Sequence, residues 1–349
     1  MSLSNYWLTK ARKLRAITSV KHRTIAASLL RICLGTTILV YYAQHLLQRE
    51  FLWGDNGMLP YATFVNIMRA QHNLSLYLLS ASPRLHTLIF YLGMLVTIAF
   101  TLGYKTRISS VLFYVFTWSL YTRSWFLLTG GDNLLYLLAF YLMFADCGQY
   151  FSLDAWLRGD KAKPDNAYAA MLHNYAMLAI VVQLCLLYFT SAFFKTQGHM
   201  WQDGTAIYYI LRANEFNLSP WAHHFYDSGA VVTLLTWGTV IFQMSWPFLI
   251  WNRHARPVMF IGALTLHSMI GYFMGLVWFS LVMISAELAI FSNAELVRFG
   301  VLVRSVVQQL WARAPVAVRG PTPLPSELTV ACIARDRLPE LSKGWEITP

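Results

Sequence analysis

The stretch YAAMLHNYAMLAIVVQLCLLYFTSAFF, residues 168–194, decides the fold class, because it contains no Lys, Arg, Asp or Glu. A helix rises about 1.5 Å per residue, so about 20 apolar residues cross the roughly 30 Å hydrocarbon core of a bilayer. This stretch is long enough for that crossing. It predicts a membrane-spanning helix.

The composition of the whole chain agrees with a membrane protein. Hydrophobic residues make up 57% of the 349 residues and charged residues only 12%, whereas soluble domains have about 45–50% and about 25%. So little polar surface cannot coat a water-soluble globule of this size. We therefore expect lipid to be the solvent for most of the chain.

Seven further apolar stretches accompany the first. Together they predict an all-α, polytopic membrane bundle of about eight transmembrane helices. The last two stretches almost touch, so the sequence leaves open whether 257–292 forms two spans or one interrupted helix. The seven stretches are 24–47, 86–103, 108–129, 133–146, 229–251, 257–274 and 276–292.

The basic residues predict the orientation. With both termini in the cytoplasm, 20 of the 27 Lys and Arg residues fall in cytoplasmic segments, as the positive-inside rule requires. This bias accounts for the net charge of +11 without nucleic acid. We expect a multi-pass protein of the cell (cytoplasmic) membrane, surrounded by the lipid bilayer. The seven other basic residues are Arg31, Arg49, Arg69, Arg84, Arg123, Lys195 and Arg212.

The chain divides into a membrane domain and a tail. Residues 1–295 are predicted to form the transmembrane domain, with 1–23 as a basic cytoplasmic N-terminus, and 296–349 a cytoplasmic, partly flexible tail. Two long outer connections, 48–85 and 195–228, contain half-apolar aromatic segments that suit helices in the membrane interface. The four cysteines are far apart, so neither a disulfide framework nor a metal site is expected.

Lys195 is the ionisable residue with the clearest chemical potential. It ends the apolar run in YFTSAFFKTQGHMWQDG (188–204) on the outer side, where basic residues are rare. Burial favours the neutral amine, which can act as a base. The alternative is a lysine that extends to the headgroups as a membrane anchor.

Three other polar positions fall within or at the ends of spans. His267 lies about ten residues into its span and is either catalytic or a hydrogen-bonded core histidine. Asp132 and Asn133 follow a glycine pair, and Asp132 is also a good helix cap. Arg31 and Glu287 are predicted to pair, since buried charges need partners, and we expect this pair to be structural.

Several motifs, taken in order, resemble the HTTM domain, the membrane region that bacterial proteins share with vitamin K-dependent gamma-carboxylases. The resemblance covers roughly 20–295, and its helix around His267 resembles the histidine-bearing helix of that family. The motifs are LGYKTR (102–107), GGDNLLYLLAFYLMF (130–144), YFSLDAWL (150–157), YFTSAFFKTQGHMWQDGTAIYY (188–209) and LHSMIGYFMGLVWFSLVMI (266–284).

The resemblance implies a chemistry. In the carboxylases, a lysine deprotonates vitamin K hydroquinone, and reaction with oxygen yields a strong base. That base removes the gamma proton of a glutamate, to which carbon dioxide adds. By motif, that lysine corresponds to Lys195, and a functional histidine of the family corresponds to His267. Another histidine of the family would fall on Asn133, so this chain departs from the family pattern at that position. The implied cofactor is reduced vitamin K or menaquinone, without a metal.

A second departure concerns the substrate. The carboxylases carry a large C-terminal domain that binds a propeptide, whereas few residues follow the last span here. Short bacterial members of this size resemble the membrane component of sporulation-delaying toxin systems, which mature a secreted antimicrobial peptide with a small partner protein. The candidate substrate-binding residues are Asp132, Asn133, Trp201, Tyr208, Tyr209 and Arg123.

Two functions remain open at this point. The first is an enzyme, a gamma-carboxylase/epoxidase-like lyase that modifies or matures a peptide at the outer face, with Lys195 as base and His267 orienting the substrate. The alternative is a non-catalytic membrane factor that binds an antimicrobial peptide precursor and presents it for maturation or export. A transporter or channel is disfavoured, because few charges fall within spans.

Overall fold

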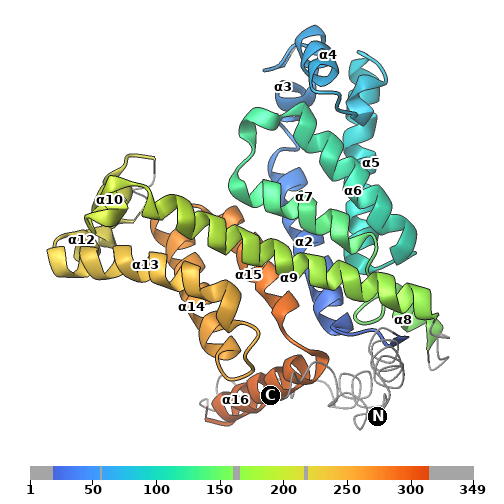
Figure 1. The fold of residues 1–349 in the computed structure, drawn as a ribbon. Coiled ribbons are helices and arrows are strands. Elements are labelled where there is room, and N and C mark those ends of the chain that lie inside the picture. The colour runs from blue at the N-terminus through green and yellow to red at the C-terminus, as the bar shows by residue number, and fades with distance from the viewer. Residues whose placement is uncertain (1–18, 56, 160–165, 216–218, 314–349) are drawn as a thin grey trace, which may run out of the picture.

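The fold is entirely helical in the part of the chain that the structure describes, a computed structural model that covers 19–55, 57–159, 166–215 and 219–313 (Figure 1). The long helices are α2 (Thr24–Gln44), α5 (Pro83–Leu102), α6 (Thr106–Arg123), α7 (Gly130–Leu142), α9 (Ala167–Thr196), α13 (Gly229–Leu249), α14 (Arg256–Phe273), α15 (Val277–Glu287) and α16 (Asn293–Arg313). This confirms the all-α part of the predicted fold class.

Short helices connect the long ones. They are α3 (Arg49–Trp53), α4 (Tyr61–Ala70), α8 (Leu153–Arg158), α10 (His199–Gln202), α11 (Ala206–Arg212) and α12 (His223–Tyr226). The two aromatic segments of the outer connections are thus helical, as α4 and as α10 with α11. Their position in a membrane interface stays a prediction.

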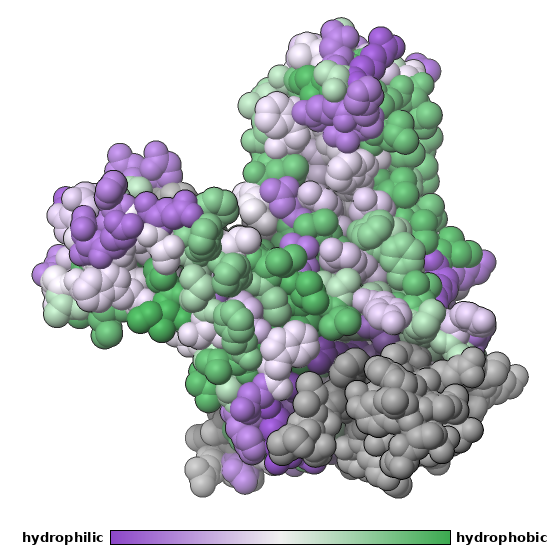
Figure 2. Space-filling model, in the orientation of Figure 1, coloured by the Kyte–Doolittle hydropathy of each residue, from purple (hydrophilic) through white to green (hydrophobic). Residues whose placement is uncertain are grey.

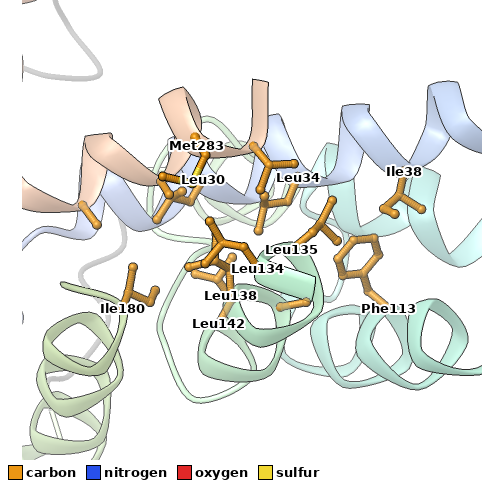
Figure 3. Close-up of a cluster of buried hydrophobic side chains, with 14 of the residues drawn as sticks. Leu30, Leu34, Ile38, Phe113, Leu134, Leu135, Leu138, Leu142, Ile180 and Met283 are labelled. Carbon is orange, nitrogen blue, oxygen red and sulfur yellow. The ribbon is translucent and has the colours of Figure 1, made fainter. Parts of the chain in front are cut away.

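The centre of the bundle is where α2, α5, α7 and α15 pack, while the C-terminal half of α9 pairs with α13 (Figure 1). In lipid the hydrophobic effect contributes little to the association of helices. Close van der Waals packing must therefore hold the helices together. Gly35 provides one such approach, because a Cβ there would lie 2.2 Å from Thr101 Oγ1 on α5. A cluster of side chains from five helices fills the core (Figure 3), namely Leu30, Leu34 and Ile38 of α2, Phe113 of α6, Leu134, Leu135, Leu138 and Leu142 of α7, Ile180 of α9 and Met283 of α15.

Four of the described helices are long and apolar enough to cross a membrane, namely α2, α5, α9 and α13. The segments Val277–Ile290 and Asn293–Gln309 would add a fifth span if they are taken together, although they bend by 118°. The predicted count of eight is therefore only partly matched. The shorter helices α7 and α15 have 13 and 11 residues, less than the roughly 20 that one straight span needs.

The segment 257–292, which the sequence left ambiguous, forms two helices. They are α14 and α15, and they pack against each other. Gly275 ends the first with a positive φ of 71°, a conformation that glycine adopts without steric penalty. The chain therefore turns back on itself here and does not continue as one interrupted helix.

The exterior of the molecule has an apolar flank and polar ends. Large apolar side chains such as Leu95 (58% exposed), Leu234 (72%) and Ile241 (65%) face outward, as expected for lipid-facing positions. In Figure 2, hydrophilic residues gather over α3 and α4 at the top and over α10 and α12 at the left, whereas green apolar surface runs along the helices between. These two polar caps are the predicted outer connections.

The predicted cytoplasmic segments meet at the other end. Lys21 forms an ion pair of 2.8 Å with Asp146, and the His22 backbone N donates to Asn174 at the start of α9. The starts of α2 and α16 adjoin, since the Asn293 side chain accepts a hydrogen bond from Ile25 N. Segments that the positive-inside rule assigns to one side therefore lie side by side. Which side of the membrane they face stays a prediction.

The tail begins as a helix. The first residues of the predicted tail, from 296, continue α16 as far as Arg313. The proline-containing remainder, 314–349, lies outside the described residues, as does most of the predicted basic N-terminus.

Candidate functional site

Lys195 lies in the last turn of α9 and is half-buried. Its Nζ donates to Ser191 Oγ at 2.6 Å and approaches the Ser191 backbone oxygen at 3.4 Å, one helical turn back. Ser191 in turn donates to Gln243 Oε1 of α13 at 3.4 Å. The amine is thus folded back along its own helix and held by uncharged groups.

Trp201 is the predicted substrate-binding residue that the structure places beside Lys195. The Lys195 Nζ lies 5.2 Å from the centre of the Trp201 ring. The sharp turn between α9 and α10 brings the two together, because Gly198 N bonds to Lys195 O at 3.0 Å and starts the next helix. An aromatic face next to an ammonium stabilises it by a cation–π interaction, which is a modest effect at a partly exposed site.

Tyr208 and Tyr209 lie on α11 in a separate aromatic group. Their rings meet edge to face at 5.3 Å. The Arg212 guanidinium bonds to the Tyr208 hydroxyl and lies 5.9 Å from the Tyr226 ring. None of the described contacts of this group reaches Lys195. Tyr209 is 53% exposed, so the group presents aromatic surface outward.

His267 is buried in a hydrogen-bonded cluster inside the bundle. The Tyr188 hydroxyl of α9 donates to Glu287 Oε1 at 2.6 Å and lies 2.9 Å from His267 Nε2. Since the hydroxyl hydrogen is used in the bond to Glu287, the hydroxyl oxygen accepts from His267, so Nε2 must carry a hydrogen and donate it to Tyr188. The tautomer is assigned here from the partners. The cluster joins α9, α14 and α15.

This cluster corrects the predicted pairing of Arg31 with Glu287, because the two residues have different partners. Glu287 bonds to Tyr188. The Arg31 side chain is fully buried, and within the described residues it donates only to backbone carbonyls, those of residues 100, 101, 147, 150 and 151. Five carbonyl dipoles replace the carboxylate that buried charges usually require. Arg31 thereby holds the 147–151 loop to the end of α5.

Three polar atoms of the interior cluster have no partner within the described residues. They are His267 Nδ1, Glu287 Oε2 and Nε1 of Trp246, whose ring stacks on Tyr188 at 4.4 Å. Buried polar atoms are nearly always satisfied, so such atoms call for water or a ligand. This group of atoms is polar, and it is enclosed by aromatic rings.

The face of α9 connects the interior cluster with Lys195. Tyr188, Ser191 and Lys195 are spaced by three and four residues, which places them along one side of the helix. Lys195 lies about 10 Å further along the axis than Tyr188. On α13, Gln243 and Trp246 face the same side chains. We define this row of side chains (Tyr188, Ser191, Lys195, Gln243 and Trp246) as the α9–α13 polar face.

Sequence reasoning missed Tyr188 and Gln243. Tyrosine within an apolar run is ordinarily a core residue, and only its spacing of seven residues from Lys195 could have singled it out. Gln243 could have been noticed as a rare amide within the span 229–251.

Asp132 and Asn133 have mainly local roles in the structure. Asp132 accepts hydrogen bonds from Thr129 N and Oγ1 at 2.8 Å and completes a capping box at the start of α7, and Tyr121 also donates to it. This matches the alternative that Asp132 is a helix cap. Asn133 is exposed.

The glycine pair before Asp132 connects this turn to His267. A Cβ on Gly131 would lie 2.6 Å from the Phe279 Cα of α15. The Phe279 ring in turn meets His267 edge to face at 5.6 Å. The turn therefore packs one residue away from the interior cluster.

Arg123 lies at the other polar cap, among α3, α4 and α5. It is fully buried, donates to the Gly54 backbone oxygen and covers the Phe64 ring at 4.9 Å. No described contact joins it to Lys195 or His267. Arg123 is thus separate from Lys195, and its predicted role in substrate binding stays a prediction.

Comparison with known proteins places the chain in a family. A family model for the HTTM domain matches residues 22–295. The chain belongs to the HTTM domain family. It is also similar to the uncharacterized protein YitO of Bacillus subtilis (strain 168), with 24% identity over 217 residues, which are 60% of this chain and 69% of that protein. No solved structure matches the chain.

Membership of the HTTM family makes this a membrane protein related to the vitamin K-dependent carboxylases. It confirms the resemblance carried by the motifs and links the family to vitamin K use. Among the described residues, no group of three or more His, Cys, Asp or Glu side chains could hold a metal ion.

Proposed function

We propose that this HTTM protein modifies or matures a peptide at the outer face of the cell membrane, as a gamma-carboxylase/epoxidase-like lyase. Lys195 is the base, and reduced vitamin K or menaquinone is the cosubstrate. The protein spans the membrane about eight times with both termini in the cytoplasm. A small maturation protein is its partner in maturing the peptide.

The observation that carries this proposal is the environment of the Lys195 amine. Its contacts are a serine hydroxyl, a backbone carbonyl and an indole ring. Within the described residues, no carboxylate lies within 4 Å of it. An amine paired with a carboxylate stays charged, whereas an amine with neutral neighbours in a partly dehydrated place can release its proton and act as a base.

The residues fit the hydroxylated end of a quinol. Lys195, Ser191 and Trp201 would hold it, with the amine facing an acidic hydroxyl and the indole providing a flat apolar wall. When bound, the reduced quinone would supply, with dioxygen, the strong base that glutamate carboxylation requires. Lys195 takes a proton at Nζ, and the Trp201 ring covers one side of the amine and limits its contact with water.

His267 has a supporting role in this proposal. Its Nε2 is held by Tyr188, which is on the same face of α9 as Lys195. The unpaired Nδ1 is left to accept a hydrogen bond from a bound molecule. His267 thus orients a substrate whose polar group reaches the interior cluster.

The proposal is tested with the purified protein in lipid nanodiscs. Menaquinol-4, dioxygen, isotopically labelled bicarbonate and a pool of synthetic glutamate-containing peptides are added, and mass spectrometry follows both quinone epoxide and peptide mass. We expect epoxide to form and labelled carbon dioxide to enter a peptide. If nanodiscs with the protein give no more of either product than empty nanodiscs, the enzymatic proposal is wrong.

The alternative is a non-catalytic factor that binds and presents a secreted peptide precursor. The aromatic group of α11 favours it, because Tyr209 is more than half exposed on an outer cap. This function predicts that Trp201→Ala, Tyr208→Ala and Tyr209→Ala reduce peptide maturation in cells more than Lys195→Met. Enzymatic function predicts the opposite order.

A further inference from the structure

Helix α16 leaves the bundle after a sharp change of direction. The segments Val277–Ile290 and Asn293–Gln309 bend by 118°, so α16 does not continue the line of α15, and it lies at the edge of the molecule below α14 (Figure 1). The 21 residues of α16 include four charged ones, whereas the candidate span α2 has one in the same length. So many charges suit a membrane surface better than a membrane interior. The four are Glu295, Arg298, Arg304 and Arg313.

The apolar and polar residues of α16 fall on different sides of the helix. Apolar residues recur at spacings of three and four, which places them along one side. Most polar residues fall between them and so lie on the other side, where Val297 and Val301 are the exceptions. We define the apolar row of α16 as Leu296, Phe299, Val303, Val306 and Val307, and its polar row as Arg298, Arg304, Ser305, Gln308 and Gln309.

The first turn of α16 is tied to the ends of other long helices. The Asn293 side chain accepts from Ile25 N and donates to Thr24 Oγ1 at 2.9 Å, and Thr24 begins the candidate span α2. Glu295 forms an ion pair of 2.8 Å with Arg256, the first residue of α14. The ends of membrane spans lie near the phospholipid headgroups. Helix α16 therefore starts at the level of the headgroups.

The apolar row begins against the bundle and continues beyond it. Leu296 packs against the buried core, so the row starts on the side of α16 that faces the apolar interior. Further along, Phe299 is 58% exposed and Val307 55%. These values match those of lipid-facing side chains on the bundle, such as Leu95. The apolar row is thus an extension of the apolar surface that acyl chains cover.

The polar row carries positive charge that is not matched within the protein. Arg298 is exposed and Arg304 partly exposed, and no ion pair among the described residues involves either arginine. The one acidic residue of α16, Glu295, is already paired with Arg256. Basic residues at the level of the headgroups are attracted to anionic lipids. The charge of α16 therefore complements an anionic membrane surface.

We propose that α16 lies in the plane of the membrane as a surface helix of one leaflet. Its apolar row lies among acyl chains, and Arg298 and Arg304 contact anionic headgroups. The partner of this exposed helix is thus a phospholipid monolayer that contains anionic lipid, and α15 and α16 do not form one span together. This surface is independent of the chemistry at Lys195.

Nitroxide labelling of the full-length protein in nanodiscs tests the placement of the two rows. The labels are attached to Val303→Cys, Val306→Cys, Ser305→Cys or Gln308→Cys, each in a variant whose four native cysteines are replaced by alanine. Dioxygen concentrates in lipid, and a nickel chelate stays in water. We expect dioxygen to relax the labels at 303 and 306 more strongly than the chelate does, and the reverse at 305 and 308.

Three results of the labelling would overturn the proposal. Access of the nickel chelate to all four positions would place α16 in water. Access of dioxygen to all four would place it inside the bilayer, as part of a span. Low access of both reagents at 303 and 306 would mean that a second copy of the chain or another protein segment covers the apolar row.

Hydrogen–deuterium exchange of the protein with its native cysteines tests the charge. We expect the amides of α16 to exchange at least about fivefold more slowly in nanodiscs that contain phosphatidylglycerol than in phosphatidylcholine alone, since one basic residue near an anionic surface contributes about that factor. Arg298→Gln and Arg304→Gln should each reduce this ratio.

The control for the exchange experiment is Arg69→Gln. Arg69 is an exposed arginine on α4, at the opposite polar cap, so the variant removes the same charge from the protein but not from α16. It should leave the ratio unchanged. Equal exchange of α16 in the two lipids, or an equal effect of Arg69→Gln, would overturn the proposal.

Discussion

Two lysines at opposite ends of α9 have contrasting environments. Lys21 lies beside the start of α9, where His173 Nε2 donates to the His22 carbonyl, and it is paired with Asp146. Lys195 lies in the last turn of the same helix, and its partners among the residues that the structure describes are all neutral. Lys195 lies 22 positions after His173 on α9, a rise of roughly 33 Å and so about the thickness of the hydrocarbon core.

The difference between these two regions separates charges that stabilise the fold from a charge that is available for catalysis. At the Lys21 end, buried charges are matched, by Asp146 for Lys21 and by backbone carbonyls for Arg31. At the Lys195 end, the amine is unmatched. A buried charge that has an oppositely polarised partner stabilises the fold. An amine without a carboxylate partner contributes little to stability and stays available to react.

The largest effect on stability is expected for Arg31→Met. It would leave several buried carbonyls without donors, which should destabilise the protein by at least about 3 kcal/mol. Arg31→Lys should recover part of this, because an ammonium can still reach some of the carbonyls. The midpoint of thermal unfolding in one detergent ranks the variants, and a midpoint of Arg31→Met equal to wild type would contradict the structural role.

Breaking the Lys21–Asp146 pair should have a similar or slightly smaller effect. Both side chains are less than one-tenth exposed, and Lys21→Met removes the ammonium that neutralises the buried Asp146 carboxylate, a loss of about 3 kcal/mol. The double variant Lys21→Met, Asp146→Leu should be more stable than the single one, since neither buried charge of the pair remains. If the double variant is less stable still, the two residues do not act as a pair.

Asp154 provides a smaller, pH-dependent contribution at the same end. Its carboxylate accepts from Lys105 N at 2.8 Å and Thr106 N at 2.7 Å, and so caps α6 from the first turn of α8. Partial burial would raise the pKa of Asp154, but hydrogen bonds from Thr106 and Lys105 outweigh it and lower that pKa. Because the folded pKa is lowered, this stabilisation is present above the ordinary value of 3.8 and is lost as pH falls through the folded pKa.

Asp154→Asn tests that contribution. It should destabilise the protein by about 1 kcal/mol near neutral pH, as for a lost helix cap. The difference from wild type should shrink as the pH is lowered below 4, and unfolding midpoints measured across this range check it. A difference that grows as the pH falls would show that the sign is wrong.

Lys195→Met should have the smallest effect on stability, below about 1 kcal/mol, because a partly exposed amine without a carboxylate contributes little. The same unfolding assay measures it. A loss as large as that of Lys21→Met would mean that Lys195 is a structural anchor, and the contrast between the two lysines would fail.

The sequence predicted the fold class and the polar caps well, because lipid imposes simple requirements on length and composition. The long apolar runs became helices, and the glycine between 274 and 276 marked the turn from α14 to α15. The number of spans was less predictable from sequence, because the length of α7 and α15 alone does not decide whether each of them crosses the membrane.

The site was only partly predictable. The nearness of Lys195 and Trp201 follows from six residues of local chain with a glycine turn between them. The Tyr188–His267–Glu287 cluster joins three helices that are distant in sequence, so no local pattern reveals it. Arg31 was assigned the wrong partner because its acceptors are backbone carbonyls, which a sequence does not display.

The most direct test of the account compares Lys195→Arg with Lys105→Arg in the menaquinol epoxidation assay. Lys105 is a suitable control, because it is an exposed lysine at a helix end whose amine also lies near an aromatic ring, Tyr104. Arginine keeps the charge but cannot serve as a base. The account predicts that Lys195→Arg falls to the level of empty nanodiscs while Lys105→Arg keeps wild-type activity. Epoxidation at the wild-type rate by Lys195→Arg would contradict it.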